Sequence, residues 1–361
     1  MNDRVDWDHM DKVRAKAFMG TMIGFMNGGA TAMMLSIGHR TGLFDTLAPL
    51  GAVTSQQLAE ASGLNERYVR EWLAAMTSAD VVEYNPTVET YELPEEHRAL
   101  LTRAGGPLNL SATMQYISLM GQVEDDVVDA FSTGAGVPYE RYPDFQRLMA
   151  EDSAARFDAA LLDTIIPCLP GAVDALTAGA TLADLGCGSG YAVLLLAEAF
   201  PNSSFVGFDF SDSGLGAGRN RAIAAGLTNV EFVAIDAAEL DRVEEFDFVT
   251  TFDAIHDQAH PMTVLRNIYQ ALKADGTYLC VEPRAASSLA ENMTEAVAPF
   301  QYTISTMHCM SVSIAGGGEG LGTAWGAERT VEFLEAAKFV GIETAEVRAD
   351  RANSYFVCRK S

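Results

Sequence analysis

The C-terminal half of the chain alternates short apolar runs with longer helical patterns, which indicates strands and helices of one domain. Apolar runs that predict strands cover residues 182–185, 204–209, 230–237, 246–252, 276–282, 341–347 and 354–358. Helical patterns cover 193–200, 261–272 and 329–339. Strands that alternate with helices predict a doubly wound α/β sheet in a domain over 167–361, with its ligand at the carboxyl ends of the strands.

The N-terminal region contains an uncharged stretch over 17–38, and a second helical pattern continues over 35–47. The uncharged stretch is long enough to span a bilayer, but its Asn, Thr, Ser and Gly residues make it much less apolar than a membrane span. Gly20, Gly24 and Gly28 lie on one helical face and permit close helix packing. We therefore predict a buried helix that is shared across a homodimer, and no membrane span.

The next segment has the outline of a winged helix. A capped short helix with a glycine turn over 54–64 and a helix over 66–77 precede a hairpin of two short strands, 81–84 and 90–93. Acidic residues on the second helix and the hairpin would repel phosphates: Glu66, Glu71, Glu83, Glu89 and Glu92. We therefore predict an N-terminal domain over 1–105 that serves dimerisation and covers an active site, without nucleic acid as a partner.

Residues 106–166 are predicted to form a helical connector that lines a cleft. Breaks at 134–136 and at Pro138 divide it into at least two helices. Methionine and aromatic residues at helical spacing are more often core than pocket, but domain junctions are also where clefts form. The candidates in this segment for a pocket that binds a small-molecule substrate are Tyr116, Met120, Tyr142 and Met149.

Composition narrows the classes of partner. The 361-residue chain is 48% hydrophobic and carries a formal net charge of −25, which argues against nucleic acid or an anionic membrane as partner and favours a small-molecule acceptor. The five cysteines have neither paired spacing nor a metal-ligand pattern. Together with the absence of a visible signal peptide, they predict a cytoplasmic protein with reduced thiols and no bound metal.

A glycine-rich turn follows the first strand of the predicted sheet. The pattern Asp-x-Gly-x-Gly-x-Gly runs from Asp184 to Gly190, and Tyr191 stands where a dinucleotide fingerprint requires its third glycine. Glycines let the backbone approach a ligand closely, at the free N–H groups of the following helix. A carboxylate before the glycines suits a ligand with an ammonium group. Alone, such a turn is as often a simple strand-to-helix connection.

Two further acids end the next two strands. Asp209 follows the glycines by about twenty residues, where a carboxylate can accept hydrogen bonds from both hydroxyls of a ribose, and Asp236 ends the third strand. Three carboxylates at successive strand ends are difficult to explain as ordinary residues of solvent-exposed loops. They favour a nucleotide-like cofactor.

This order of motifs resembles the class I S-adenosylmethionine-dependent methyltransferases. The resemblance implies a Rossmann-like seven-stranded sheet with its last strand antiparallel, and an N-terminal winged-helix domain occurs in many small-molecule members. It implies S-adenosylmethionine as cofactor and S-adenosylhomocysteine as product. The cofactor-binding residues that it implies are Asp184, Gly186, Cys187, Gly188, Gly190, Asp209, Phe210, Asp236, Ala237 and Phe252.

A histidine follows the fourth strand, at the carboxyl edge of the predicted sheet. Its near-neutral pKa suits removal of a proton from a hydroxyl or a thiol; alternatively, it only caps the next helix. His256-Asp257 and the later Leu265-Arg266-Asn267 are similar to motifs of the plant-type O-methyltransferases, in which that histidine is the catalytic base. The resemblance also implies acids that flank it. These catalytic candidates are His256, Asp257, Glu282 and Glu328.

The chain departs from that family at two positions and carries an insertion. Gln258 replaces a tryptophan, and Phe252 replaces a lysine near the adenine, where an aromatic ring could stack instead. The insertion over 290–326 is rich in apolar and sulfur-containing residues, which suit a weakly polar acceptor. It adds the pocket candidates Phe300, Met307 and His308, although His308, like His260, is more often structural.

The sequence therefore predicts a homodimeric methyltransferase that acts on an oxygen or a sulfur of a small molecule, with His256 as general base. Two alternatives stay open. One is an N-methyltransferase for a small amine. The other is a winged-helix regulator that binds S-adenosylmethionine only as a ligand, and the acidic hairpin counts against it.

Overall fold

The computed structural model describes residues 9–361. The chain divides into two compact units, 1–118 and 119–361. The predicted connector over 106–166 is split between them, and the three-part division of the chain stays a prediction. Within the described residues, no single helix is long and apolar enough to cross a membrane; a bent pair, 145–168 and 172–178, passes the same test of length and composition.

The first unit begins with a long helix, α1 (Lys12–Thr41), whose first turn is capped by the Asp11 carboxylate. The sequence pattern predicted a separate helix over 35–47. Instead, α1 continues to Thr41, and only α2 (Leu43–Leu47) follows as a short helix. The break lies at Gly42, which takes a left-handed conformation with φ of 73°. Glycine thus decides where the long helix ends.

The predicted winged helix is present. A capping box of Thr54 and Gln57 begins α3 (Ser55–Ser62), and α4 (Glu66–Ser78) follows. Strands β1 (Glu83–Asn85) and β2 (Thr90–Glu92) form the hairpin, and α5 (Glu95–Leu101) and α6 (Leu110–Thr113) complete the unit's helices. Its core includes Phe44, Leu47, Leu58, Trp72, Leu73 and Met76.

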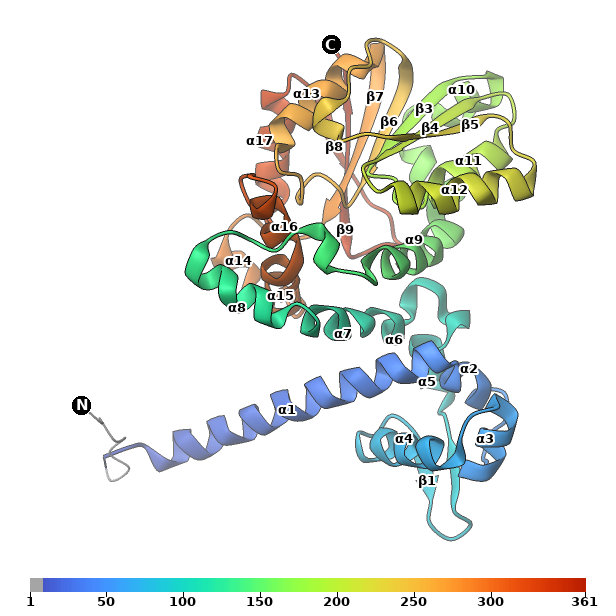
Figure 1. The fold of residues 1–361 in the computed structure, drawn as a ribbon, viewed down its shortest axis with the longest axis vertical. Helices are drawn as coiled ribbons and strands as arrows, with labels where there is room; N and C mark the ends of the chain where they lie inside the picture. The colour runs from blue at the N-terminus through green and yellow to red at the C-terminus, as the bar shows by residue number, and fades with distance from the viewer. Residues whose placement is uncertain (1–8) are drawn as a thin grey trace. The chain divides into compact units, whose positions relative to one another are not determined.

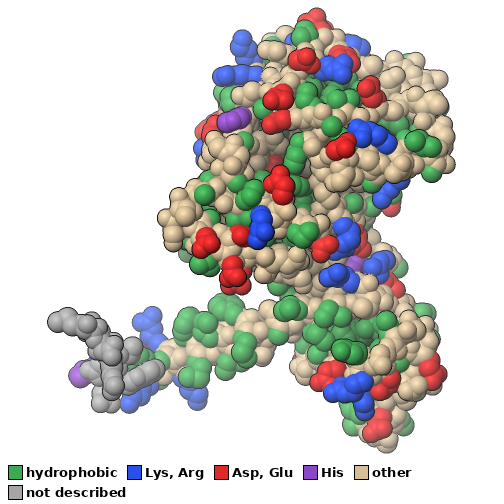
Figure 2. Space-filling model, in the orientation of Figure 1, with side chains coloured by type: hydrophobic (Ala, Val, Ile, Leu, Met, Phe, Trp, Pro, Cys, Tyr) green, Lys and Arg blue, Asp and Glu red, His purple; other side chains and the backbone are tan. Residues whose placement is uncertain are grey.

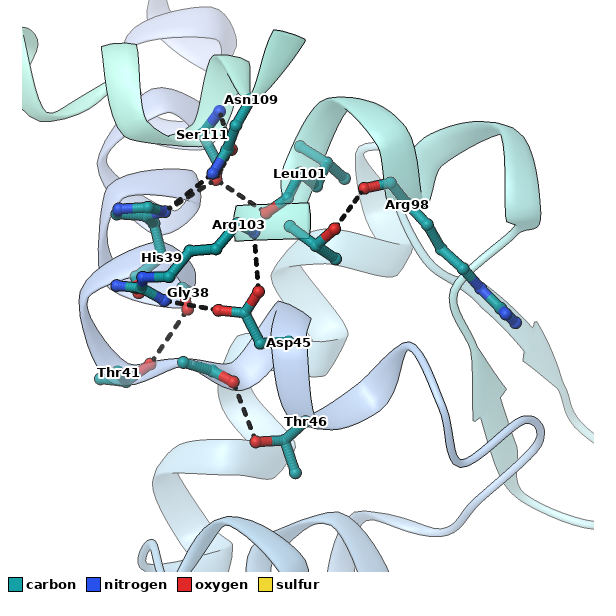
Figure 3. Close-up of polar contacts among 12 residues, drawn as sticks. Gly38, His39, Thr41, Asp45, Thr46, Arg98, Leu101, Arg103, Asn109 and Ser111 are labelled. Carbon is teal, nitrogen blue, oxygen red and sulfur yellow. Dashed lines mark hydrogen bonds and ion pairs between the residues drawn. The ribbon is translucent and has the colours of Figure 1, made fainter. Parts of the chain in front are cut away.

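A buried polar cluster joins the end of α1 to residues 98–111 (Figure 3). The His39 Nδ1 atom lies 3.4 Å from Asn109 Nδ2 and 3.3 Å from Ser111 Oγ. Arg103 donates to the His39 carbonyl at 3.0 Å and pairs with Asp45. Buried polar groups are stabilising only when they are hydrogen-bonded, and these contacts fix the end of α1 on the unit's own helices.

The second unit contains the predicted seven-stranded sheet. Its strand order is β5-β4-β3-β6-β7-β9-β8; β3 to β7 are mutually parallel, and β9 is antiparallel to both β7 and β8. The strands are β3 (Thr181–Leu185), β4 (Ser204–Asp209), β5 (Val230–Ala234), β6 (Phe246–Phe252), β7 (Leu272–Pro283), β8 (Val340–Ala345) and β9 (Asn353–Arg359). This arrangement confirms the fold class that the sequence predicted.

Helices cover both faces of the sheet (Figure 1). One core cluster joins Leu182 of β3 to residues of α10 (Ala172–Ala178), α11 (Tyr191–Ala199) and α12 (Asp212–Ala225). The other joins the adjacent Ala183 to α13 (Pro261–Ala271) and α17 (Ala327–Ala336). Successive strand residues point to opposite faces, so β3 is buried on both sides.

The unit's other helices precede the sheet or lie in the insertion. Helices α8 (Glu124–Thr133) and α9 (Phe145–Ala160) come before it, and α7 (Gln115–Gly121) spans the division between the units. The insertion holds α14 (Leu289–Asn292), α15 (Ala298–Ile304), the π-helical turn η6 (Ser305–Cys309) and α16 (Met310–Ala315).

Candidate functional site

The glycine turn connects β3 to α11 in a conformation that requires glycine. Gly186, Gly188 and Gly190 all have positive φ, between 57° and 72°. A Cβ atom on Gly190 would lie 2.1 Å from the Phe232 ring, and one on Gly186 would lie 2.7 Å from the Ala254 Cβ. Side chains at these positions are therefore excluded by both conformation and space.

Asp209, at the end of β4, holds the glycine turn from the neighbouring strand. Its side chain is 7% exposed, and its two oxygens accept from Gly188 N and Ser211 N, each at 2.8 Å. Burial raises the pKa of Asp209, although these two hydrogen bonds oppose the rise. The carboxylate is thus fixed beside the turn, as a ribose-binding acid would need to be.

Asp184, at the end of β3, is a buried acid with one hydrogen-bonding neighbour. It is 3% exposed and accepts from Thr250 Oγ1 of β6 at 2.7 Å. Burial raises the pKa of Asp184 to about 7. A cationic group beside this carboxylate would favour its ionised form. The sequence indicated Asp184 but not Thr250, which approaches it from another strand.

The other cofactor candidates lie at the same carboxyl edge or near it. Asp236 is exposed, two residues beyond β5, and its Oδ1 accepts from Ala238 N at 2.8 Å at the start of the short helix η5 (Ala237–Glu239). Phe210 is 56% exposed. Phe252 packs edge-to-face on Phe157 of α9, with 4.8 Å between ring centroids. Their contact with a cofactor stays a prediction.

His256 is buried beside the end of β7. Its Nδ1 atom lies 2.8 Å from Glu282 Oε2, and the histidine and the glutamate are 4% and 1% exposed. Glu282 also accepts from Ile255 N at 3.0 Å and from Trp325 Nε1 at 3.1 Å. Three donors therefore fix this carboxylate, and the carboxylate fixes the orientation of the imidazole.

Charges around His256 favour its protonated form. Burial alone would lower its pKa, but the Glu282 carboxylate and an interaction with Cys309 raise the pKa of His256 well above its usual value. Burial raises the pKa of the adjacent Asp257 to about 7. An imidazole with a buried carboxylate partner is a strong base whenever it is unprotonated.

The structure corrects the expectation for Glu328. We expected this residue to flank His256, but its side chain is exposed and its Oε2 accepts from Ser287 N at 2.8 Å. Interactions with the backbone N–H groups of Glu328 itself and of Ser287 lower the pKa of Glu328. Trp325, three residues earlier, contacts Glu282 instead. The turn before α17 thus brings an indole N–H rather than a second acid to the site.

Three of the predicted pocket residues come together. Tyr142 donates to the Met307 carbonyl at 2.5 Å, and its ring lies 4.6 Å from the ring of His308. Met149 on α9 and Phe300 on α15 are half-buried. Tyr116 and Met120 are buried on α7. Sequence analysis missed Tyr139 and Phe145, which also contact His308.

A buried ionic cluster around Arg156 was not predicted. Arg156 of α9 pairs with Asp253 at 2.6 Å and lies 3.6 Å from Asp350. Burial alone would lower the pKa of Arg156, but Asp253, Asp152 and Asp350 raise it. Asp253 directly follows β6 and has a positive φ of 53°. The sequence carried no signal for this cluster, because Arg156 is one of several charged residues on α9.

Two family comparisons agree with the two units. Residues 29–103 match the family described as Rv2258c-like winged HTH domain, and residues 176–346 match the family described as Methyltransferase domain. Among curated relatives, a demethylmenaquinone methyltransferase of Listeria monocytogenes is 32% identical over 106 residues, which are 29% of this chain and 45% of the relative. The chain thus spans about half the length of the curated relatives it matches.

Solved structures share the fold over nearly the whole chain. Mitomycin 7-O-methyltransferase MmcR has a TM-score of 0.70 at 16% identity, with 97% of this chain and 99% of that chain covered. Human N-acetylserotonin methyltransferase, solved in complex with S-adenosylmethionine, has a TM-score of 0.68 at 15% identity, with 98% and 99% covered. The chain thus combines an N-terminal region that matches the Rv2258c-like winged HTH domain with a C-terminal region that matches the methyltransferase domain.

Proposed function

We propose that the protein transfers a methyl group from S-adenosylmethionine to an oxygen or sulfur of a small molecule, with His256 as general base. The observation that carries this proposal is the buried pair of His256 and Glu282 at the carboxyl ends of β6 and β7. The glycine turn and Asp209 lie at the same edge, after β3 and β4. Ligands of doubly wound sheets bind at this edge.

The residues at the glycine turn fit S-adenosylmethionine. Asp184 is a buried carboxyl that forms no ion pair among the described residues, although the charge of Arg156 lowers its pKa in part, and an ammonium group would provide a direct partner. Asp209 is fixed by two backbone donors, yet carboxylate oxygens have further lone pairs for two hydroxyls. Space at Gly186 and Gly190 is too small for a Cβ atom. Among the described residues, no group of His, Cys, Asp and Glu could hold a metal ion.

The protein's own part in the reaction is positioning and proton removal. When bound, S-adenosylmethionine supplies an electrophilic methyl group for direct displacement. His256 would take the acceptor's proton, and Glu282 would stabilise the resulting imidazolium. Three donors hold Glu282 in place. Holding acceptor and donor in line provides the rest of the acceleration.

A panel assay tests this proposal. Purified protein with S-adenosylmethionine should release S-adenosylhomocysteine with at least one member of a panel of phenols and thiols. Amines in the same panel test the N-methyltransferase alternative. Release with amines alone would contradict the proposed acceptor chemistry. Cofactor binding without turnover on any acceptor, together with binding of duplex DNA at low salt, would support a regulator instead.

Binding of S-adenosylmethionine is expected to release a proton near neutral pH. The pKa of Asp184 is about 7 in the free protein, so below pH 7 the carboxyl is mostly protonated and must ionise to pair with an ammonium group. Affinity should therefore rise as pH increases from about 5.5 to 7, by up to about tenfold per pH unit. Calorimetry in buffers of different ionisation enthalpy measures the proton.

The matched variant is Asp184→Asn. It keeps a side chain of similar shape beside Thr250 but has no proton to release. It should bind more weakly and lose the pH dependence. If the wild type binds equally well from pH 5.5 to 7, or if the variant keeps the same proton release, Asp184 does not pair with the ammonium group.

We further propose that the protein is a homodimer and uses α1 in its interface. Large apolar side chains are exposed along this helix within the single chain (Figure 2): Phe18, Met19, Met22, Ile23, Phe25 and Met26 are between 49% and 67% exposed. Contiguous exposed apolar surface is typical of interaction sites, and a second copy offers the same face for a symmetric contact. The acidic composition disfavours nucleic acid and anionic membranes as partners.

Charge on this face should therefore weaken the dimer. Phe25→Glu is expected to shift the protein toward monomer in analytical ultracentrifugation without detergent. Ile223→Glu, at a 77% exposed position on α12, is the matched control and should leave the wild-type mass unchanged. A wild type that sediments as a monodisperse monomer at micromolar concentration would exclude the shared helix.

A further inference from the structure

His308 is a buried histidine with no hydrogen-bonding partner among the described residues. Its side chain is 2% exposed, and neither Nδ1 nor Nε2 is hydrogen-bonded. An unsatisfied buried polar group costs about 1–3 kcal/mol, and such groups in folded proteins require an explanation. A phenylalanine would fill the position without that cost.

Aromatic side chains surround the imidazole. The Phe145 ring stacks on it at 3.9 Å with an interplanar angle of 13°, and Tyr142 and Tyr139 approach edge-to-face at 4.6 and 5.9 Å. Tyr139 also contacts Phe210, next to Asp209, at 4.9 Å. The aromatic group therefore extends from the insertion to the edge of the sheet where the cofactor is proposed to bind. Such rings favour flat aromatic ligands.

The same helical turn also reaches the proposed base. His308 and Cys309 belong to the π-helical turn η6, and Cys309 interacts with His256 and accepts from Thr323 Oγ1 at 3.1 Å. π-helical turns are rare and frequently occur at functional sites. This turn places one histidine with unsatisfied nitrogens next to the residue that contacts the other histidine.

We propose that His308 is the specificity-determining residue of the acceptor site, which hydrogen-bonds a second polar substituent of a flat, uncharged aromatic acceptor while His256 acts on the hydroxyl to be methylated. The inference rests on the proposed function. It names the acceptor class as aromatic rings that carry a hydroxyl and a neighbouring hydroxyl or carbonyl group.

Charge around the site supports an uncharged acceptor. Burial, with a smaller effect of His256, lowers the pKa of His308 to about 3, so its imidazole is neutral near pH 7 and offers one donor and one acceptor. The raised pKa of His256 favours its cationic form, which disfavours a cationic acceptor. Asp257 and, to a smaller extent, Asp209 disfavour an anionic acceptor beside Tyr139. A neutral hydroxyl or carbonyl satisfies the ring nitrogens without adding charge.

The test compares two acceptors with the same rings in two variants. The acceptors are 2,3-dihydroxynaphthalene and 2-naphthol, which lacks the second hydroxyl. His308→Phe keeps a ring for stacking on Phe145 and removes both nitrogens, whereas His308→Gln keeps a donor and an acceptor without the ring. His260→Phe, at an exposed histidine, is the control for histidine replacement. The readouts are kcat/KM for S-adenosylhomocysteine release, and acceptor binding by naphthalene fluorescence with S-adenosylhomocysteine present.

His308→Phe should lower kcat/KM and affinity for the diol by about 10- to 100-fold, the usual effect of leaving a buried polar group unpaired. The effect on 2-naphthol should be about threefold or less, so the variant loses the wild-type preference for the diol. His308→Gln should keep part of this preference, and His260→Phe should behave as the wild type. S-adenosylhomocysteine affinity should be unchanged throughout.

Several results would overturn the inference while the proposed function survives. These are equal losses for both acceptors in His308→Phe, no loss for either, or a wild type that methylates other acceptors but binds neither naphthol. If His308→Phe does not fold, His308→Gln becomes the test. A partly retained preference of this variant for the diol over 2-naphthol supports the inference, and a complete loss of that preference counts against hydrogen bonding at this position. A wild type that releases no S-adenosylhomocysteine with any phenol or thiol overturns the proposed function itself.

Discussion

Replacing His256 with alanine is expected to lower kcat for an oxygen acceptor by about 10²–10⁴, the usual contribution of a positioned general base. A hydroxyl is a weak nucleophile until its proton is removed, whereas a thiol with a pKa near 8.5 is partly ionised at neutral pH. The loss for a thiol acceptor should therefore be smaller, especially at high pH. Steady-state S-adenosylhomocysteine release measures both.

The pH profile separates a base from a merely structural histidine. Because Glu282 and Cys309 raise the pKa of His256 well above its usual value, the rate should rise as pH increases through that raised pKa. Glu282→Gln removes the charge that raises the pKa, so its profile should begin to rise at lower pH.

The control for His256→Ala is cofactor affinity, which should stay nearly unchanged because the residue is assigned to the acceptor side. Near-wild-type turnover of His256→Ala at neutral pH would contradict the assignment. Asp257, whose pKa is about 7, would then be the next candidate base. Glu328 would not be a candidate, because its exposed carboxylate accepts a hydrogen bond from Ser287 N.

Replacing Arg156 with methionine is expected to destabilise the second unit by about 3–5 kcal/mol, the usual cost of removing one partner of a buried ion pair. Methionine has a similar length, but it removes the guanidinium that lies over the Phe157 ring and leaves Asp253, Asp350 and Asp152 without their cation. Chemical denaturation at pH 7 measures the loss, as a lower midpoint with an unchanged slope.

Arg219→Met is the matched control. Arg219 also pairs with an aspartate, Asp212, but the two side chains are 41% and 81% exposed. Exposed pairs contribute about 1 kcal/mol or less, so this variant should stay near wild-type stability. Equal effects of the two substitutions would mean that the Arg156 cluster contributes no more than a surface ion pair.

The sequence by itself determined the fold class and indicated the edge of the sheet at which the candidate site lies. Apolar runs of strand length alternated with helical patterns, and β4 and β6 have the predicted bounds. The glycines at 186, 188 and 190 could be assigned to a tight turn because only glycine takes their conformation easily. Acids at strand ends and His256 after β6 could be placed because parallel strands end at one edge.

Tertiary structure alone decided which side chains meet. Glu282 was predicted beside His256 only from a family resemblance, and the contact of Trp325 with Glu282 was not predicted. The Arg156 cluster joins α9 to the ends of two strands that are distant in sequence. The sequence did not distinguish His308 from the other histidines, and only the structure shows that its two ring nitrogens are buried without hydrogen bonds.

The physical reason is that these properties depend on contacts between distant segments. Periodicity is a local property, and it reports which face of an element is buried. Hydrogen bonds, desolvation and pKa shifts depend on what lies within a few ångströms in space. Thr250 and Asp184, from two adjacent strands but 66 residues apart, show this most simply. The sequence determined the scaffold and indicated the edge of the candidate site, and the tertiary structure determined which groups there are paired, charged or unsatisfied.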